Sequence, residues 1–150
     1  MTKREEALDW VLSLLESQLV GVLATEGGGT PYASLVAFAF TPDMRKLMFV
    51  TPISSRKFRN VGENSRVALL VDDRRNLPSD LKNAAAVTAV GSAKLAEKEE
   101  EERMLRILMD RHPCLNEFAQ FSSSALIVVD VEAYILVSRF QDVVELRMQG

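Results

Sequence analysis

Residues 49–57 read Phe49-Val50-Thr51-Pro52-Ile53-Ser54-Ser55-Arg56-Lys57. The stretch begins inside an apolar segment typical of a β-strand, residues 46–51, and leads into residues 56–61, where apolar side chains are three apart. This spacing lets a short helix bury one face. The hydroxyls of Ser54 and Ser55 suit the start of that helix, because they accept hydrogen bonds from its free amides. The stretch therefore predicts a strand that runs directly into a helix.

The start of this helix is basic, although the chain as a whole is acidic. Arg56, Lys57 and Arg59 place three positive charges within four residues, whereas the net charge of the chain is −3. Cations are unfavourable at the positive end of a helix dipole by about 0.3–1 kcal/mol, and a bound phosphate would offset that cost. Alternatively, the three side chains extend into solvent or pair with surface carboxylates. The residues alone leave both interpretations open.

A helix and three strands are predicted from the N-terminal third of the chain. Thr2 and Glu5 have the spacing of a capping box, and apolar residues recur at helical intervals through residues 2–18. Strands are predicted for residues 19–25, 31–40 and 46–51. The run Gly27-Gly28-Gly29 lacks the Lys-Ser/Thr and the helix of a phosphate loop, so it predicts a hairpin turn. Such short spacings are typical of an antiparallel meander.

The remainder of the chain adds strands and helices to the same domain. Strands are predicted for residues 66–71, 84–95, 125–131 and 133–138. Residues 72–83 are predicted to form a polar loop. Gly91 predicts a bulge or bend within the strand over residues 84–95. The glutamate-rich residues 97–103 predict a solvated helix start, since carboxylates suit the positive end of the dipole. Six or seven mostly antiparallel strands with three or four helices predict a mainly β (α+β) barrel with peripheral helices, in one domain over residues 1–150.

The composition is that of a globular protein and excludes several classes of function. Hydrophobic residues make up 47% and charged residues 26% of the chain, and the pI is near 5.3. A chain without a basic excess is not expected to bind nucleic acid. No apolar run approaches the roughly 20 residues of a membrane span, and no signal peptide is apparent, so we expect a cytoplasmic protein. One cysteine, Cys114, and one histidine, His112, cannot form a disulfide framework or a His/Cys-rich zinc site, so no metal is predicted.

Five segments in a fixed order carry a family resemblance. They read Gly29-Thr30-Pro31-Tyr32-Ala33-Ser34-Leu35-Val36, Lys46-Leu47-Met48-Phe49-Val50-Thr51, Ser55-Arg56-Lys57, Val61 with Glu63-Asn64-Ser65-Arg66-Val67-Ala68-Leu69, and Val90-Gly91-Ser92-Ala93-Lys94. In this order and spacing they resemble the pyridoxamine 5′-phosphate oxidase-like FMN-binding split barrels, over about residues 8–146. The most specific part is residues 51–57 together with the Asn-x-Arg-Val strand that follows.

The resemblance implies a homodimer with its flavin, FMN, in a groove between the two subunits. By position, Arg56 and Lys57 would contact the phosphate, with the hydroxyls of Thr51 and Ser55 as partners. The backbone of Val50 would touch the ring, and residues 34–39 would line the other edge of the ring. The predicted cofactor-binding residues are therefore Ser34, Leu35, Val36, Val50, Thr51, Ser55, Arg56 and Lys57. Long apolar strands over residues 20–25, 84–91 and 125–137 also favour a dimer, because one subunit would not cover them.

An FMN-binding flavoprotein is the function that the resemblance implies, most simply an oxidoreductase acting on an unidentified small substrate. The flavin would supply the redox chemistry, and no residue is identified as a general acid or base. The oxidases proper have an arginine in place of Ser34 and a lysine in place of Ala39. They also carry a tryptophan and a basic, histidine-containing C-terminal segment, which residues 144–150 do not match. True pyridoxamine 5′-phosphate oxidase activity is therefore not expected, and Trp10, the one tryptophan, is expected in the core.

A non-catalytic flavin- or haem-binding protein of the same fold is the alternative. The residues that resemble the haem-utilisation branch are Arg111-His112-Pro113, Phe118, Phe121 and Ser138-Arg139-Phe140. His112 is the candidate haem ligand, although a histidine beside a proline at a helix end is also typical of a cap or a packed group. That branch binds haem with an additional C-terminal region that this chain lacks. A third alternative is a dimeric scaffold without a cofactor.

Overall fold

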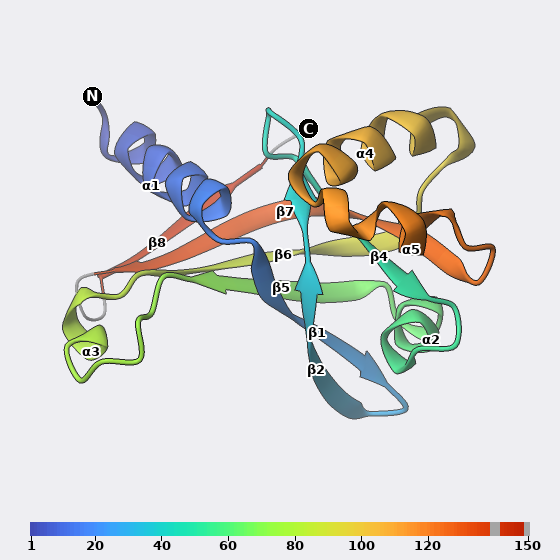
Figure 1. Cartoon of the computed structure of the whole chain (residues 1–150). Coiled ribbons are helices and arrows are strands. Elements are labelled where there is room, and N and C mark those ends of the chain that lie inside the picture. Colours follow the sequence, from blue (N-terminus) through green and yellow to red (C-terminus); the bar gives the residue numbers. More distant parts are fainter. Residues whose placement is uncertain (139–141, 149–150) are drawn as a thin grey trace.

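A single curled antiparallel sheet dominates the structure, a computed structural model that describes residues 1–138 and 142–148. The strands are β1 (Val20–Gly27), β2 (Thr30–Ala37), β3 (Ala39–Phe40), β4 (Lys46–Pro52), β5 (Arg66–Asp72), β6 (Ala86–Leu95), β7 (Ser124–Ser138) and β8 (Asp142–Arg147). Their order is β2-β1-β5-β6-β7-β4-β3, with β8 also beside β7 (Figure 1). This confirms the predicted mainly β split barrel. The described part holds eight strands rather than six or seven, because β3 is separate from β2 and β8 was not predicted.

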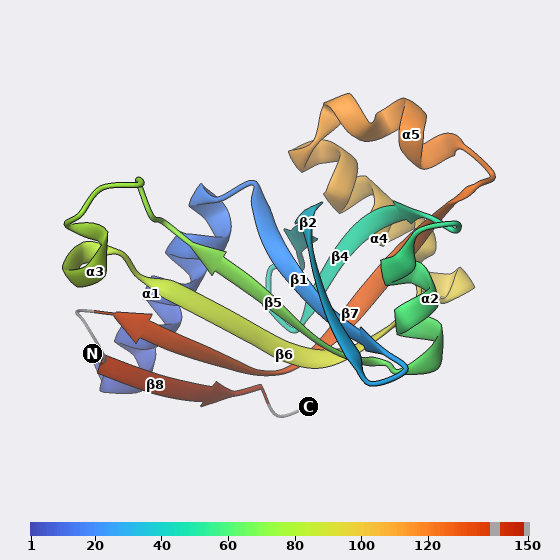
Figure 2. The same ribbon diagram turned by 90° about the horizontal axis from the view of Figure 1, so that it is seen from below.

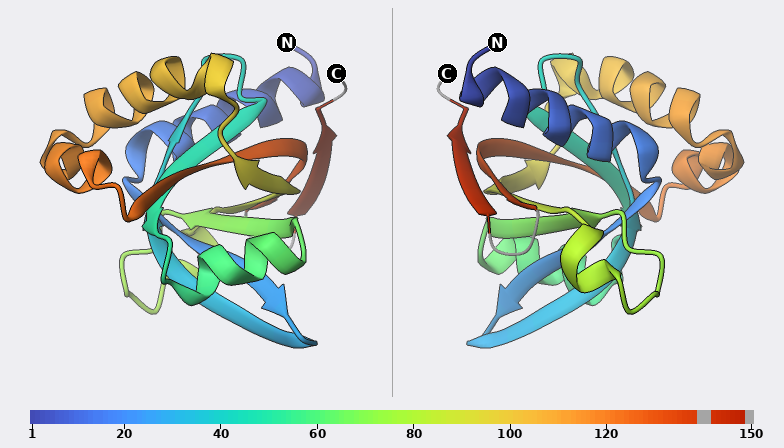
Figure 3. Two further views of the ribbon diagram at one scale, coloured as in Figure 1. Left: turned by 90° about the vertical axis from the view of Figure 1, so that its right-hand side faces the viewer. Right: turned by 90° about the vertical axis from the view of Figure 1, so that its left-hand side faces the viewer.

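Helices lie around the sheet, as predicted. They are α1 (Lys3–Ser17), α2 (Arg56–Glu63), α3 (Asp80–Asn83), α4 (Lys98–Arg111) and α5 (Asn116–Gln120), with a 3₁₀ turn at Pro113–Leu115. In Figure 3, α1 lies above the curled sheet and α2 below it, and side chains of both helices, such as Val11 and Val61, belong to the same core. The short helix α3 interrupts the segment that the sequence predicted to be a polar loop. None of the described helices is long and apolar enough to cross a membrane.

The main core lies inside the curl of the sheet and is closed by α1. Thr2 forms the predicted capping box with Glu5, and the apolar face of α1 contributes Val11, Leu14 and Leu15 to the core. Trp10 packs against this core and is partly buried. A second, smaller cluster lies on the other face of β4 and β7, where α4 covers them. Because both faces of β4 and β7 are buried, these strands are apolar almost throughout.

The glycine run after β1 forms a two-residue hairpin loop. Gly27 pairs with Thr30, so Gly28 and Gly29 are the loop residues, and their φ angles are +58° and +86°. Two positive φ angles define the turn type that matches the twist of a hairpin, and glycine adopts them without strain. The prediction of a hairpin turn rather than a phosphate loop is confirmed.

The long strand β7 is one continuous strand and not the two that the sequence predicted. It spans 15 residues, and its ladder with β6 changes register at Gly91, so that Glu132 has no partner on β6. A bulge of this kind adds one residue without ending the ladder, which is why the predicted break did not occur. A β-carbon on Gly91 would overlap the carbonyl oxygen of Asp130, so the close approach of the two strands requires glycine. The predicted irregularity at Gly91 is confirmed, although the extra residue of the bulge, Glu132, lies on β7.

Replacing Gly91 with alanine should lower the stability of the fold, because the new β-carbon meets backbone that cannot move aside. We expect the free energy of unfolding to fall by about 1–3 kcal/mol, measured by urea denaturation. Gly62→Ala is the matched control, since a β-carbon there meets nothing within 4 Å, and helix propensity should raise stability by up to about 1 kcal/mol. Equal midpoints for the Gly91→Ala protein and the wild type would contradict the role assigned to the bulge.

Candidate functional site

The barrel is open between β2 and β4. Along its whole length β2 pairs with β1, and β4 pairs with β7 on one side and with the short β3 on the other. In the described part of the chain, residues 34–37 of β2 and residues 49–52 of β4 therefore have no ladder partner on their second edge, although the two strands are in contact. Backbone N–H and C=O groups on such edges are available to a ligand.

The end of β4 leads through a tight turn into α2, as the sequence predicted. Ser55 caps the helix, its hydroxyl accepting a hydrogen bond of 3.2 Å from the amide of Phe58. The hydroxyl of Thr51, a residue only 1% exposed, lies 2.8 Å from the hydroxyl of Ser55. Two hydroxyls and the free amides of the first helical turn thus gather at the end of the open edge of β4.

Arg56 extends from the first turn of α2 to β2. Its guanidinium carbon lies 5.2 Å from the centre of the Tyr32 ring, a cation–π distance. The tip of the β1–β2 hairpin and α2 lie side by side (Figure 2). Within residues 1–138 and 142–148, neither Arg56, Lys57 nor Arg59 forms an ion pair. Pairing with surface carboxylates, one part of the alternative interpretation, is therefore not observed, whereas Arg56 and Arg59 are exposed to solvent.

Ser34 brings an unsatisfied polar group to the same region. It follows Tyr32 by two residues on β2, so the two side chains lie on one face of the strand. Its hydroxyl oxygen is buried and has no hydrogen-bond partner among the described residues. An unsatisfied buried group costs about 1–3 kcal/mol, so a ligand with a polar atom would be stabilised here. The residues present thus fit an anionic ligand that lies between β2 and α2.

The predicted cofactor residues divide into two groups in the structure. Thr51, Ser55 and Arg56 come together at the start of α2, with Lys57 half-buried beside them. The three apolar residues of the predicted site border the opening only with their backbone. The side chain of Leu35 is exposed, that of Val36 is in the main core, and that of Val50 packs beneath α4. The sequence reasoning missed Tyr32, whose only signal was its two-residue spacing from Ser34.

His112 is packed rather than presented to a ligand. It is 6% exposed, and its Nε2 lies 2.7 Å from the carbonyl oxygen of Phe38. Because a carbonyl only accepts, Nε2 carries the proton and is not free to bind a metal. The neighbouring Arg111 donates to the carbonyls of Leu15 and Gln18, so that this pair fastens α4 to the end of α1. Arg139 and Phe140, part of the proposed haem resemblance, lie outside the described residues.

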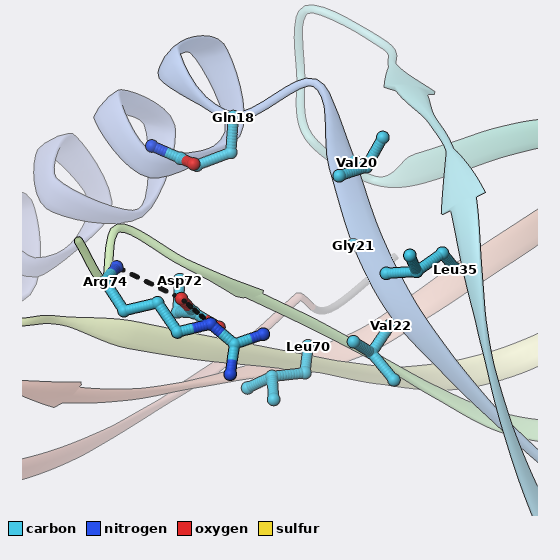
Figure 4. A pocket seen from close by; sticks show the side chains of 8 residues that line it. All are labelled: Gln18, Val20, Gly21, Val22, Leu35, Leu70, Asp72 and Arg74. Carbon is cyan, nitrogen blue, oxygen red and sulfur yellow. Dashed lines mark hydrogen bonds and ion pairs between the residues drawn. The ribbon is translucent and has the colours of Figure 1, made fainter. Parts of the chain in front are cut away.

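The outer face of β1, β2 and β5 carries an apolar patch with a shallow pocket. The patch consists of Val20, Val22, Leu35 and Leu70, of which Leu35 is 67% and Val20 51% exposed. A pocket of about 140 Å³ opens among them, and the Asp72–Arg74 ion pair, at 3.2 Å, lies on its rim (Figure 4). Contiguous exposed apolar residues of this kind mark interaction surfaces.

Comparison with known proteins identifies relatives by sequence and by fold. The family described as "Pyridoxamine 5′-phosphate oxidase" matches residues 8–138. None of the curated proteins matches the chain. A haem-binding protein from Mycobacterium smegmatis superposes with a TM-score of 0.84 at 20% identity. The match covers 98% of this chain but only 58% of the Mycobacterium smegmatis chain. An FAD-binding protein from Mesorhizobium loti gives 0.68 at 16% identity, with 87% and 92% covered. A putative pyridoxamine 5′-phosphate oxidase from Listeria innocua gives 0.64 at 25% identity, with 84% and 94% covered.

Proposed function

Because the chain belongs to the pyridoxamine 5′-phosphate oxidase family, we propose that it binds flavin mononucleotide at the opening between β2 and β4. The observation that carries this proposal is the start of α2, where Arg56 and Lys57 have no counter-ion within the described residues and stand beside the Thr51–Ser55 hydroxyl pair. A phosphate supplies the missing negative charge and the acceptors. The unsatisfied hydroxyl of Ser34 supports a ligand at the same place.

Each part of the site has a distinct task in this proposal. The amides of the first turn of α2, with Arg56 and Lys57, hold the phosphate, while the open backbone edges of residues 34–36 and Val50 orient the ring. When bound, a flavin supplies reversible one- and two-electron transfer, and the protein contributes position and electrostatics. We propose an oxidoreductase that acts on a small substrate. Position 39 carries no cation, because the residue there is Ala39, which is buried beneath α4. The lack of a cation at this position favours a substrate other than pyridoxine phosphate.

Purified protein should bind FMN, and the basic residues at the start of α2 should supply much of the affinity. Arg56→Ala and Lys57→Ala should each weaken binding by about 10- to 100-fold, because each removes a charge-assisted hydrogen bond worth about 1.5–3 kcal/mol. The dissociation constants are measured by flavin fluorescence quenching. Arg59→Ala removes the same charge one turn along α2 and should change the constant less than threefold. No flavin binding by the wild type would refute the proposal.

The cofactor would lie at the interface of a homodimer in which the apolar patch on β1, β2 and β5 is covered. Light scattering at micromolar concentration should give about twice the 16.7 kDa of one chain. Leu35→Glu should shift the protein towards the monomer, since it places a charge in the patch. Leu95→Glu, at another exposed leucine, is the control and should leave the mass unchanged. A wild-type monomer would contradict the dimer.

Haem binding without catalysis is the second candidate, because the haem-binding protein of Mycobacterium smegmatis shares the fold. The hydrogen bond from His112 to Phe38 argues against that histidine as the ligand. We therefore expect that any Soret band produced by haem titration is the same in the His112→Ala protein as in the wild type. A band that disappears in this variant, together with no affinity for FMN, would favour haem.

A further inference from the structure

A buried polar contact joins α2 to the β1–β2 hairpin. The side-chain amide of Asn60 donates a 3.0 Å hydrogen bond to the hydroxyl of Thr25, and the two residues are 8% and 4% exposed. Both residues are polar, and each is a hydrogen-bond partner of the other. Breaking such a contact leaves a buried group unsatisfied, so the contact holds the two elements in one relative position.

The contact between Asn60 and Thr25 lies next to the cation–π contact between Arg56 and Tyr32. Thr25 and Tyr32 are paired across the β1–β2 ladder, so their side chains lie on the same face of the hairpin. Arg56 and Asn60 are four residues apart on α2, so they share one face of the helix. One turn of α2 therefore spans one cross-strand pair: Asn60 meets Thr25, and Arg56 meets Tyr32.

Gly27 sets how closely the helix approaches the hairpin. It follows Thr25 by two residues on the same face of β1, and a β-carbon there would overlap the side-chain oxygen of Asn60 and lie 3.2 Å from a carboxylate oxygen of Glu63. The amide of Asn60 cannot turn aside without losing Thr25. A side chain at position 27 must therefore either break that hydrogen bond or move α2 away from the hairpin.

We infer that Gly27 and Asn60 are positioning residues that fix the distance between β2 and the start of α2, and thereby aim the phosphate-binding groups at Ser34. The inference rests on the proposed flavin site and deepens it. The groups that would bind the phosphate belong to α2, whereas Tyr32 and Ser34 belong to the hairpin. Without a fixed distance between helix and hairpin, one ligand could not contact both. Asn64 adds a weaker tie of 3.4 Å to Glu26, farther along the same side of α2.

The test separates phosphate affinity from flavin affinity. Riboflavin lacks the phosphate, so the ratio of the dissociation constants of riboflavin and FMN measures what the phosphate contributes. Gly27→Ala and Thr25→Val should each lower this ratio at least tenfold and change riboflavin binding less than threefold. Thr25→Ser keeps the hydroxyl and should retain the wild-type ratio. Tyr134→Phe removes a buried 2.7 Å hydrogen bond to Met44, away from α2, and should lower stability with the ratio unchanged.

Amide hydrogen exchange in the protein without ligand gives a second readout. The hydrogen-bonded amides of α2, from Phe58 and Arg59 onward, should exchange at least tenfold faster in Gly27→Ala and Thr25→Val than in Tyr134→Phe or the wild type. Folded variants that keep both the ratio and the exchange rates would overturn the inference while leaving the flavin site intact. If the wild type binds neither flavin, the proposed function fails, and the exchange rates still decide whether Gly27 and Asn60 hold the helix.

Discussion

The architecture depends on β7, which pairs with two different strands along the same edge. The strand β7 pairs with β4 up to Asp130 and with β8 from Ala133 onward, while β6 pairs with its other edge from Ile127 to Val137. The bulge at Glu132 lies where the partners change. There the amide of Val131 donates to the carbonyl of Arg45, and the carbonyl of Glu132 accepts from the amide of Met148. Because β4 and β8 diverge from this point, the sheet curls into a barrel that β2 and β4 do not close.

The sequence predicts those features whose physical cause is local. The capping box of α1, the glycine hairpin and the strand that runs into a capped helix at Ser55 each depend on residues within a few positions of one another. The continuity of β7 was not predictable in this way, because the bulge is set by Gly91 on a different strand. The contact between Thr25 and Asn60 joins residues 35 positions apart, and no periodicity marks it. The residues of the candidate site on β4, α2 and β2 therefore follow largely from the sequence, whereas the contact that holds α2 against the hairpin required the fold.

Cations have two contrasting environments in this acidic protein. Lys46 lies 3.0 Å from Glu100 and 3.3 Å from Asp130, and the hydrogen bond to Glu100 raises the pKa of Lys46 above its ordinary value. Lys94 binds Glu97 at 2.7 Å in the same cluster, which fastens the start of α4 to the sheet. The three cations at the start of α2 have no such neutralisation within the described chain. The contrast separates a structural use of charge from one that suits a ligand.

The guanidinium of Arg111 joins α1 to a part of the chain that the ribosome synthesises much later. It caps the end of α1 through the carbonyls of Leu15 and Gln18, and Arg4 of the same helix donates to the carbonyl of Arg147. At roughly 5–20 residues per second, a ribosome needs about 5–20 s to travel from the end of α1 to Arg111. Throughout that interval the apolar face of the first helix has no completed barrel to cover. Nascent chains would thus offer an amphipathic N-terminal helix to chaperones well before they could bind any cofactor.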